Sequence, residues 1–77
     1  MIKKRITKDK ERIIILEAIY SARGDFNSVP IKEFNDSEYQ FQKESLELVK
    51  QANCKLKWID TFAGGCWYIV PLIKTHR

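Results

Sequence analysis

The sequence predicts a small α+β domain in which three helices are followed by a C-terminal β-hairpin. Two observations carry this prediction. Apolar residues recur at helical spacing along the first two thirds of the chain. From Cys54 onward they alternate with polar residues and flank a pair of glycines, as in a hairpin. A chain of 77 residues with a hydrophobic content of 44% can form one core but not two.

The first helix is expected over residues 8–22, after a flexible basic arm over residues 1–7. Thr7 supplies an N-cap, and Asp9 follows in the first turn, where a carboxylate interacts favourably with the helix dipole. Arg23-Gly24 then ends the helix. The apolar stripe expected to pack consists of Ile15, Leu16, Ile19 and Ala22, widened by Ile13 and Tyr20.

Two further helices are expected before the hairpin, so that residues 8–53 contain three. A short helix over 30–34 begins with a proline, which suits the first turn of a helix. Ser37 and Gln40 then form a capping-box pattern that predicts the start of a third helix. Asn53 is expected to end this helix in the left-handed conformation.

The hairpin is expected over residues 54–73. Its parts are a strand over 55–59, a turn at Ala63-Gly64-Gly65, a strand over 66–70 that ends at Pro71, and a tail over 74–77 beyond it. Three helices followed by a hairpin form the winged helix-turn-helix arrangement. The sequence therefore predicts a single winged-helix domain over residues 1–77, with another small α+β domain as the alternative.

Charge is distributed unevenly along the chain. The net charge is +4, with +4 in residues 1–12, −3 in residues 13–50 and +3 in residues 51–77. Basic ends favour a polyanion such as nucleic acid, although lysines also keep small domains soluble. Two cysteines do not make a disulfide framework, and the apolar run Ile13–Leu16 is too short for a signal peptide or membrane span. A cytoplasmic protein without membrane contact is expected.

Candidates for catalysis or metal binding are few. The single histidine, His76, lies next to the C-terminal residue, and Cys54 and Cys66 lack the partners of a zinc site. Gly64-Gly65 lacks the helix and lysine of a phosphate-binding loop. The protein is therefore expected not to be an enzyme and to use no metal or cofactor.

The leading function predicted from this fold is binding of double-stranded DNA by a small transcriptional regulator. The third helix would enter the major groove, where glutamine pairs with adenine, while lysines of the wing and arm would hold phosphates. The candidate DNA-binding residues are Lys3, Lys4, Arg5, Tyr39, Gln40, Gln42, Lys43, Lys50, Lys55 and Lys57. Residues 36–50 carry four acidic and two basic side chains, and this net charge of −2 opposes contact with phosphates.

The alternative function is a protein-interaction module. Its candidate residues are the aromatic side chains of the hairpin, Trp58, Phe62, Trp67 and Tyr68. Strand parity places Trp58, Phe62 and Trp67 on one face and Tyr68 on the other, together with Ile59 and Val70. A partner protein, or a second copy of the chain in a homodimer, would bind whichever face stays uncovered. The competing expectation is that the first helix and Leu72-Ile73 cover both faces.

Two segments resemble a known family. Arg12–Tyr20, with the sequence RIIILEAIY, resembles the opening helix of the YjcQ-like winged-helix proteins of phages and Gram-positive bacteria. The pattern Glu38–Phe41, leading through Leu46 and Leu48 to the hairpin, is similar to the same family. The resemblance spans residues 8–73, and the hairpin tip Thr61–Gly65 departs from the polar tip expected there. It implies a DNA-binding type of fold in a small phage or prophage protein and no catalytic residue.

Overall fold

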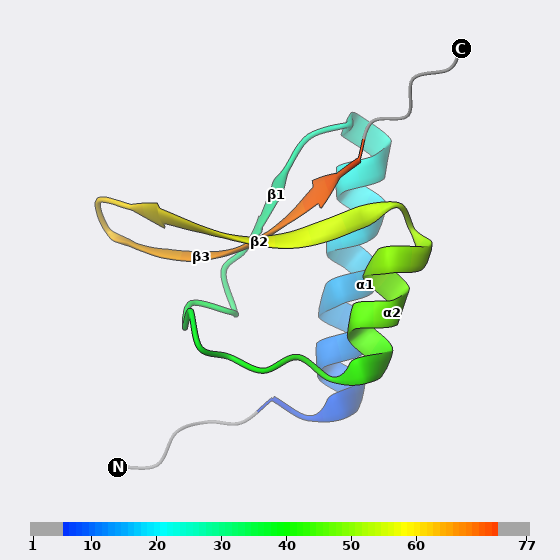
Figure 1. Ribbon diagram of the computed structural model, residues 1–77, viewed down its shortest axis with the longest axis horizontal. Coiled ribbons are helices and arrows are strands. Elements are labelled where there is room, and N and C mark those ends of the chain that lie inside the picture. Colours follow the sequence, from blue (N-terminus) through cyan, green and yellow to red (C-terminus); the bar gives the residue numbers. More distant parts are fainter. Residues whose placement is uncertain (1–5, 73–77) are drawn as a thin grey trace.

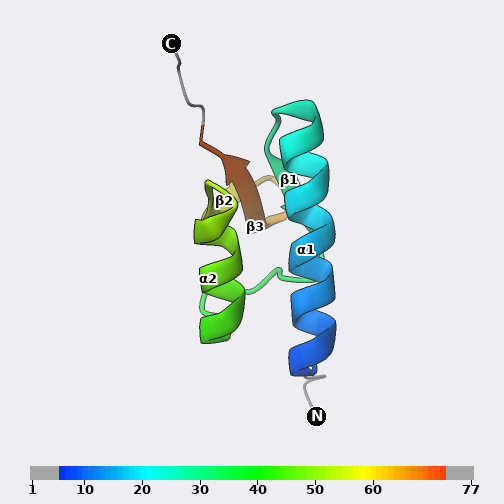
Figure 2. The same ribbon diagram turned by 90° about the vertical axis from the view of Figure 1, so that its right-hand side faces the viewer.

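The computed structural model describes residues 6–72 and consists of two helices packed on a three-stranded antiparallel sheet (Figure 1). The elements are α1 (Lys8–Asp25), β1 (Val29–Ile31), α2 (Lys43–Gln51), β2 (Cys54–Thr61) and β3 (Gly64–Pro71). The strand order is β1-β3-β2, so β1 and β2 are the two edges of the sheet. Figure 2 shows α1 and α2 side by side on the same side of the sheet.

The predicted winged helix-turn-helix is wrong, because the described residues contain two helices and a three-stranded sheet rather than three helices and a hairpin. The segment expected as the short helix over 30–34 instead begins with β1, which pairs antiparallel with β3. Val29 and Ile31 point to the covered side of the sheet and Pro30 to the other, an alternation that suits a strand. Pro30 is tolerated because β1 is an edge strand.

The predicted start of the third helix at Ser37 is also wrong, because α2 begins only at Lys43. The Asp36 side chain accepts a hydrogen bond from the Glu38 amide at 3.0 Å, and the Asp36 carbonyl accepts one from the Tyr39 amide at 3.0 Å. These bonds make a turn at the place where the capping box would have formed. The chain then runs without helical structure into α2.

An aromatic cluster holds the segment between β1 and α2. Phe34 is 1% exposed, and its ring centroid lies 4.8 Å from that of Tyr39 and 5.0 Å from that of Phe41. Phe41 packs edge-to-face on Trp67 of β3, with 5.4 Å between the ring centroids, and the Trp67 centroid lies 5.8 Å from that of Trp58 in β2. The cluster ties this segment to the side of the hairpin that faces the helices.

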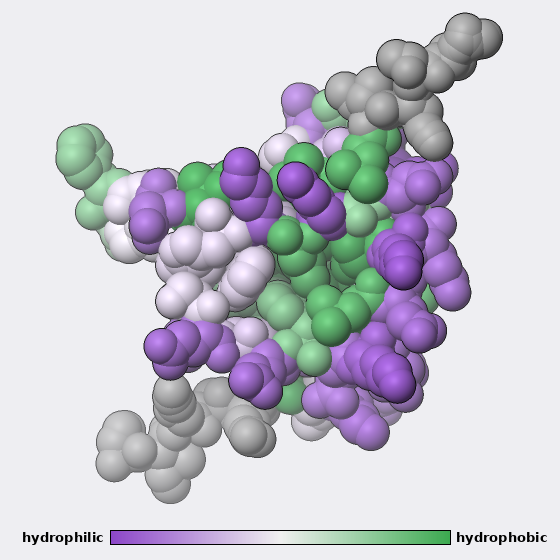
Figure 3. Space-filling model, in the orientation of Figure 1, coloured by the Kyte–Doolittle hydropathy of each residue, from purple (hydrophilic) through white to green (hydrophobic). Residues whose placement is uncertain are grey.

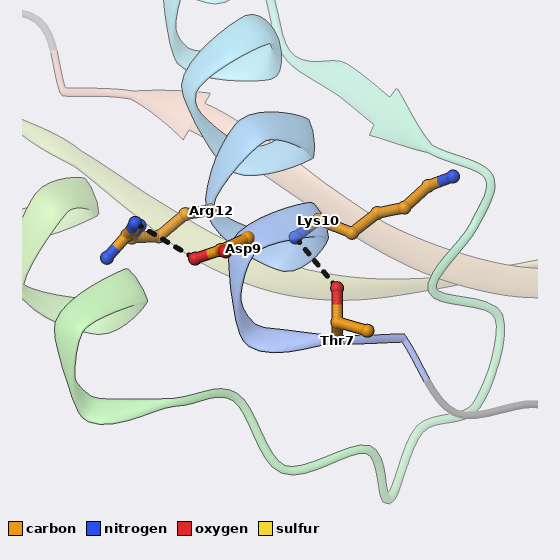
Figure 4. A network of polar contacts seen from close by, with 4 residues as sticks. All are labelled: Thr7, Asp9, Lys10 and Arg12. Carbon is orange, nitrogen blue, oxygen red and sulfur yellow. Dashed lines mark hydrogen bonds and ion pairs between the residues drawn. The ribbon is translucent and has the colours of Figure 1, made fainter.

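The predicted start of α1 is confirmed. The Thr7 hydroxyl oxygen accepts a hydrogen bond from the Lys10 amide at 3.2 Å, so Thr7 is the N-cap (Figure 4). Arg12 forms an ion pair with Asp9 at 3.2 Å on the exposed side of the first turns. The Thr7 hydroxyl satisfies one of the first amide groups, which lack partners within the helix, and the ion pair joins two side chains of the same turns.

The buried face of α1 matches only part of the predicted stripe. Ile15, Ile19 and Ala22 are buried as expected, whereas Ile13, Leu16 and Tyr20 are exposed. The core consists of Ile15, Ala18, Ile19, Ala22, Ile31, Phe34, Val49, Cys54 and Ile69. Because apolar side chains occupy opposite faces of α1, helical spacing alone does not select the buried one.

The hairpin is formed by β2 and β3, which are longer than predicted. Asn53 leads into β2 with φ 59°, which confirms the predicted left-handed conformation. The turn residues are Phe62 and Ala63, and Gly64 follows them with a positive φ of 122°. The predicted turn is wrong for Gly64 and Gly65, because these residues pair with Thr61 and Asp60 as the first two residues of β3.

The end of α1 contains a strained residue, Phe26. The helix runs past Gly24 to Asp25, and Phe26 follows with φ 55° and a side chain that is 71% exposed. A side chain costs about 1 kcal/mol in this left-handed region, where glycine is unstrained. We expect Phe26→Gly to raise the free energy of unfolding by about 0.5 kcal/mol, measured by urea denaturation.

Phe62→Gly is the matched control, since Phe62 is exposed and its φ is not positive. It should leave stability unchanged or slightly lower it, because glycine gains freedom in the unfolded chain. A lower urea midpoint for Phe26→Gly than for the wild type would contradict the expected relief of strain.

Candidate functional site

The strand register divides the hairpin side chains between two faces. Trp58 lies opposite Trp67, on the inner face that the helices cover. Lys57 lies opposite Tyr68, and Lys55 opposite Val70, on the outer face. Both described helices lie on the inner side (Figure 2), so the outer face carries no helix of residues 6–72. Among those residues, α1 therefore does not cover both faces.

The candidate protein-interaction residues occupy three different environments. The Trp67 indole N–H donates to the Asp36 carbonyl at 3.0 Å, and the Trp58 indole N–H donates to the Asp60 carboxylate at 2.9 Å. Both tryptophans are half-buried on the inner face, while Tyr68 is half-buried on the outer face, as strand parity predicted. Phe62 is fully exposed in the turn and lies on neither face.

Close packing fixes the Trp58 ring over the hairpin. A Cβ atom added to Gly65 would lie 2.8 Å from the Trp58 ring and 2.7 Å from the Ile59 carbonyl oxygen. Any larger residue at position 65 would displace one of them. Together with the hydrogen bond to Asp60, this contact holds one side of the indole against β3.

The candidate DNA-binding residues do not form one surface. Lys3, Lys4 and Arg5 lie outside the described residues. Among the others, Gln40 and Gln42 lie in the segment before α2, Lys43 and Lys50 lie at the two ends of α2, and Lys55 and Lys57 lie on β2. The β2 lysines point to the outer face, whereas α2 packs on the inner side. The helix and the β2 lysines therefore do not share a face with which they could contact one duplex, as the prediction required.

Tyr39 has a structural role that the DNA prediction did not anticipate. Its hydroxyl donates to the Glu11 Oε1 atom at 2.6 Å, and the Gln42 amide donates to Oε2 at 2.8 Å. Glu11 has no exposed surface at all. Sequence reasoning missed Glu11, although it lies one helical turn before Ile15 on the buried face of α1. An acidic residue on the apolar face of a predicted helix indicates a buried carboxyl group that accepts hydrogen bonds from another segment.

The net charge of the described domain is close to zero. Residues 6–72 carry nine basic and ten acidic side chains, hence −1, and the other five basic residues lie in 1–5 and 73–77. Nucleic-acid binding depends mainly on neutralising phosphates with Lys and Arg. Residues 6–72 carry no such excess of Lys and Arg.

The surroundings of Cys54 do not favour a reactive thiolate. Burial raises the pKa of the Cys54 thiol above its ordinary value, and the nearby positive charge of Arg23 lowers it in part. A thiol with a raised pKa is a poor nucleophile at neutral pH. In the part of the chain that the structure describes, no three His, Cys, Asp or Glu residues are grouped to hold a metal ion. None of the described helices has the length and apolar character that crossing a membrane requires.

The most distinctive surface lies along β2. This strand pairs with β3 on one side only, so within residues 6–72 its other edge is free of a strand partner. Figure 3 shows apolar surface between β2 and α2, bordered by hydrophilic residues over α2. Four partly exposed apolar side chains of α2, of the inner face of β2 and of the segment entering α2 are called the α2–β2 surface here: Phe41, Leu46, Leu56 and Trp58.

Comparison of the chain with protein-family models, with curated proteins and with solved structures finds no match. The resemblance to YjcQ-like proteins therefore stays a prediction, as does the expectation that the protein is not an enzyme.

Proposed function

We propose that the protein is a non-enzymatic protein-interaction module that binds a partner polypeptide through the free edge of β2 and the adjoining α2–β2 surface. The observation that carries this proposal is a strand of eight residues, β2, with one edge that lacks a strand partner within residues 6–72, beside partly exposed apolar side chains. Unpaired strand edges present rows of N–H and C=O groups, which pair with another polypeptide backbone. Exposed apolar patches rimmed by polar residues are typical of protein interfaces.

Two features favour a polypeptide over duplex DNA as the partner. A strand edge is matched by a peptide backbone, which offers amide donors and acceptors at the same spacing. The described domain has a net charge of −1, and its β2 lysines and α2 lie on different sides of the sheet. Binding to double-stranded DNA, the leading sequence prediction, becomes the competing outcome of the test. Both cysteines are free, which supports the cytoplasm as the proposed location.

The proposal predicts that peptide binding depends on Leu46. Random 12-residue peptides displayed on phage would be selected on the folded protein and then measured one by one. We expect Leu46→Asp to weaken the selected peptides at least about tenfold, because a charge would replace an apolar contact in the interface. Leu16→Asp is the matched control, since both leucines are helical and 47% exposed. It should change affinity by less than about twofold.

Fluorescence anisotropy of a labelled random duplex at low and moderate salt tests the competing function. Micromolar, salt-sensitive duplex binding that is unchanged by Leu46→Asp, with no peptide enriched, would contradict the proposal and favour DNA binding. Enriched peptides that bind both leucine variants equally would also count against it, because the α2–β2 surface would then have no part in binding.

A further inference from the structure

The β2 edge carries a chemical pattern that identifies its ligand more closely. Lys55 and Lys57 point to the outer face, and both are exposed. Leu56 and Trp58 alternate with them and point to the inner face. Side chains of equal parity are about 6.6 Å apart along a strand, and an extended peptide repeats with the same period. A strand laid beside β2 therefore presents its own residues alternately to the lysines and to the apolar side.

On the outer face, charge complementarity determines which residues the incoming strand should carry. The outer positions of β2 and β3 hold Lys55 and Lys57 and no acidic residue, and Asp60 belongs to the inner set. Opposite charges on adjacent strands stabilise pairing, and like charges oppose it. An incoming strand with Glu or Asp at alternate positions places a carboxylate beside each lysine.

The inner face determines which residues the ligand should carry between its acidic positions. There the incoming side chains extend from β2 toward the α2–β2 surface, beside the apolar region that Figure 3 shows between β2 and α2. The Trp58 indole is fixed by its hydrogen bond to Asp60 at 2.9 Å and by close contact with Gly65. A fixed ring provides apolar contact area without losing side-chain freedom on binding. Branched apolar residues at the alternate positions of the ligand would cover this surface.

A second copy of the chain fits the edge less well. Pairing of two β2 strands would bring four lysines, two from each copy, to the same face of a joined sheet without an acidic neighbour from β2 or β3. Lysines on edge strands commonly prevent such self-pairing. The charge pattern thus favours a ligand of different composition over a homodimer.

We infer that the β2 edge docks an extended segment of a partner protein in which acidic and branched apolar residues alternate, the acidic ones beside Lys55 and Lys57. This inference rests on the proposed protein-binding function and adds the class of ligand. The docked segment becomes the fourth strand of the sheet, in the order β1-β3-β2-ligand.

The test uses the full chain labelled with ¹⁵N and three capped synthetic peptides. The first contains Glu-Val-Glu-Val-Glu-Val, the second has the same residues in blocks as Glu-Glu-Glu-Val-Val-Val, and the third has lysine in place of glutamate. We expect the alternating acidic peptide to shift the amide resonances of β2 and to bind at least about tenfold more tightly than either control.

Charge reversal on the protein provides the matched variant. Lys55→Glu combined with Lys57→Glu should weaken the acidic peptide at least about tenfold and make the lysine peptide the better ligand. Lys8→Glu combined with Lys10→Glu changes the net charge equally at exposed positions of α1, and it should leave the affinity within about twofold. Amide spectra of all variants report whether the fold is intact.

Equal binding of the block peptide, shifts that avoid β2, or no binding would overturn the inference, as would a dimer joined through β2 that excludes the peptide. Its failure is distinguishable from failure of the proposed function. Selected peptides that depend on Leu46 but lack the alternating pattern would leave the protein-binding function intact and remove only this ligand class. The absence of any Leu46-dependent peptide would remove both.

Discussion

Replacing Glu11 by alanine is expected to lower the free energy of unfolding by at least about 3 kcal/mol. The Glu11 carboxyl group is fully buried and accepts hydrogen bonds from the Tyr39 hydroxyl at 2.6 Å and from the Gln42 amide at 2.8 Å. Alanine removes both acceptors and leaves a cavity at a fully buried position of α1. A domain of this size is stable by about 4–12 kcal/mol, so the loss is a large share of the total.

Chemical denaturation followed by circular dichroism measures this loss, with two further variants to separate its causes. Glu17→Ala makes the same change at an exposed position of α1 and should cost less than about 0.5 kcal/mol. Glu11→Gln keeps the shape and one acceptor oxygen, so it should cost about 1–2 kcal/mol. Similar losses for Glu11→Ala and Glu17→Ala would show that the buried hydrogen bonds do not stabilise the fold.

The same carboxyl group explains why part of the fold was predictable and part was not. α1 and the hairpin were predictable because their signals are local: the Thr7 cap, the alternation of β2 and the positive-φ glycine at position 64. The start of α2 depends instead on Glu11, which binds the Gln42 amide from 31 residues away in the chain. A local capping pattern at Ser37 competes with that contact and loses, as local propensities do when tertiary packing opposes them.

β1 was missed for a related reason. Val29–Ile31 forms three pairs with β3, a strand that lies about half the chain away, and nothing within the segment itself distinguishes it from a first helical turn. This pairing also determines the candidate site. Because β1 takes the free side of β3, β2 becomes the edge that carries Lys55 and Lys57. Strand alternation predicts the face on which each hairpin side chain lies. It does not predict which of the two hairpin strands has a free edge, because that depends on where β1 pairs.

Replacing Phe34 by alanine is the second change expected to have a large effect, with a loss of about 3–5 kcal/mol in the free energy of unfolding. Phe34 is 1% exposed and joins three parts of the molecule. Its ring contacts Tyr39 and Phe41, and its carbonyl accepts a hydrogen bond from the Trp67 amide of β3 at 2.9 Å. Alanine keeps the backbone bond and removes the ring at the centre of the cluster.

Phe62→Ala is the control for this prediction, because it removes the same ring from a fully exposed position and should cost less than about 0.5 kcal/mol. Trp67 belongs to the cluster through Phe41, so Phe34→Ala should also alter tryptophan fluorescence and near-ultraviolet circular dichroism, whereas Phe62→Ala should not. Losses of equal size in the two variants would mean that the aromatic cluster does not hold the segment between β1 and α2. A large loss at Phe34 alone would establish that this segment, which has no regular structure after β1, is fixed by side-chain packing as firmly as a helix would be.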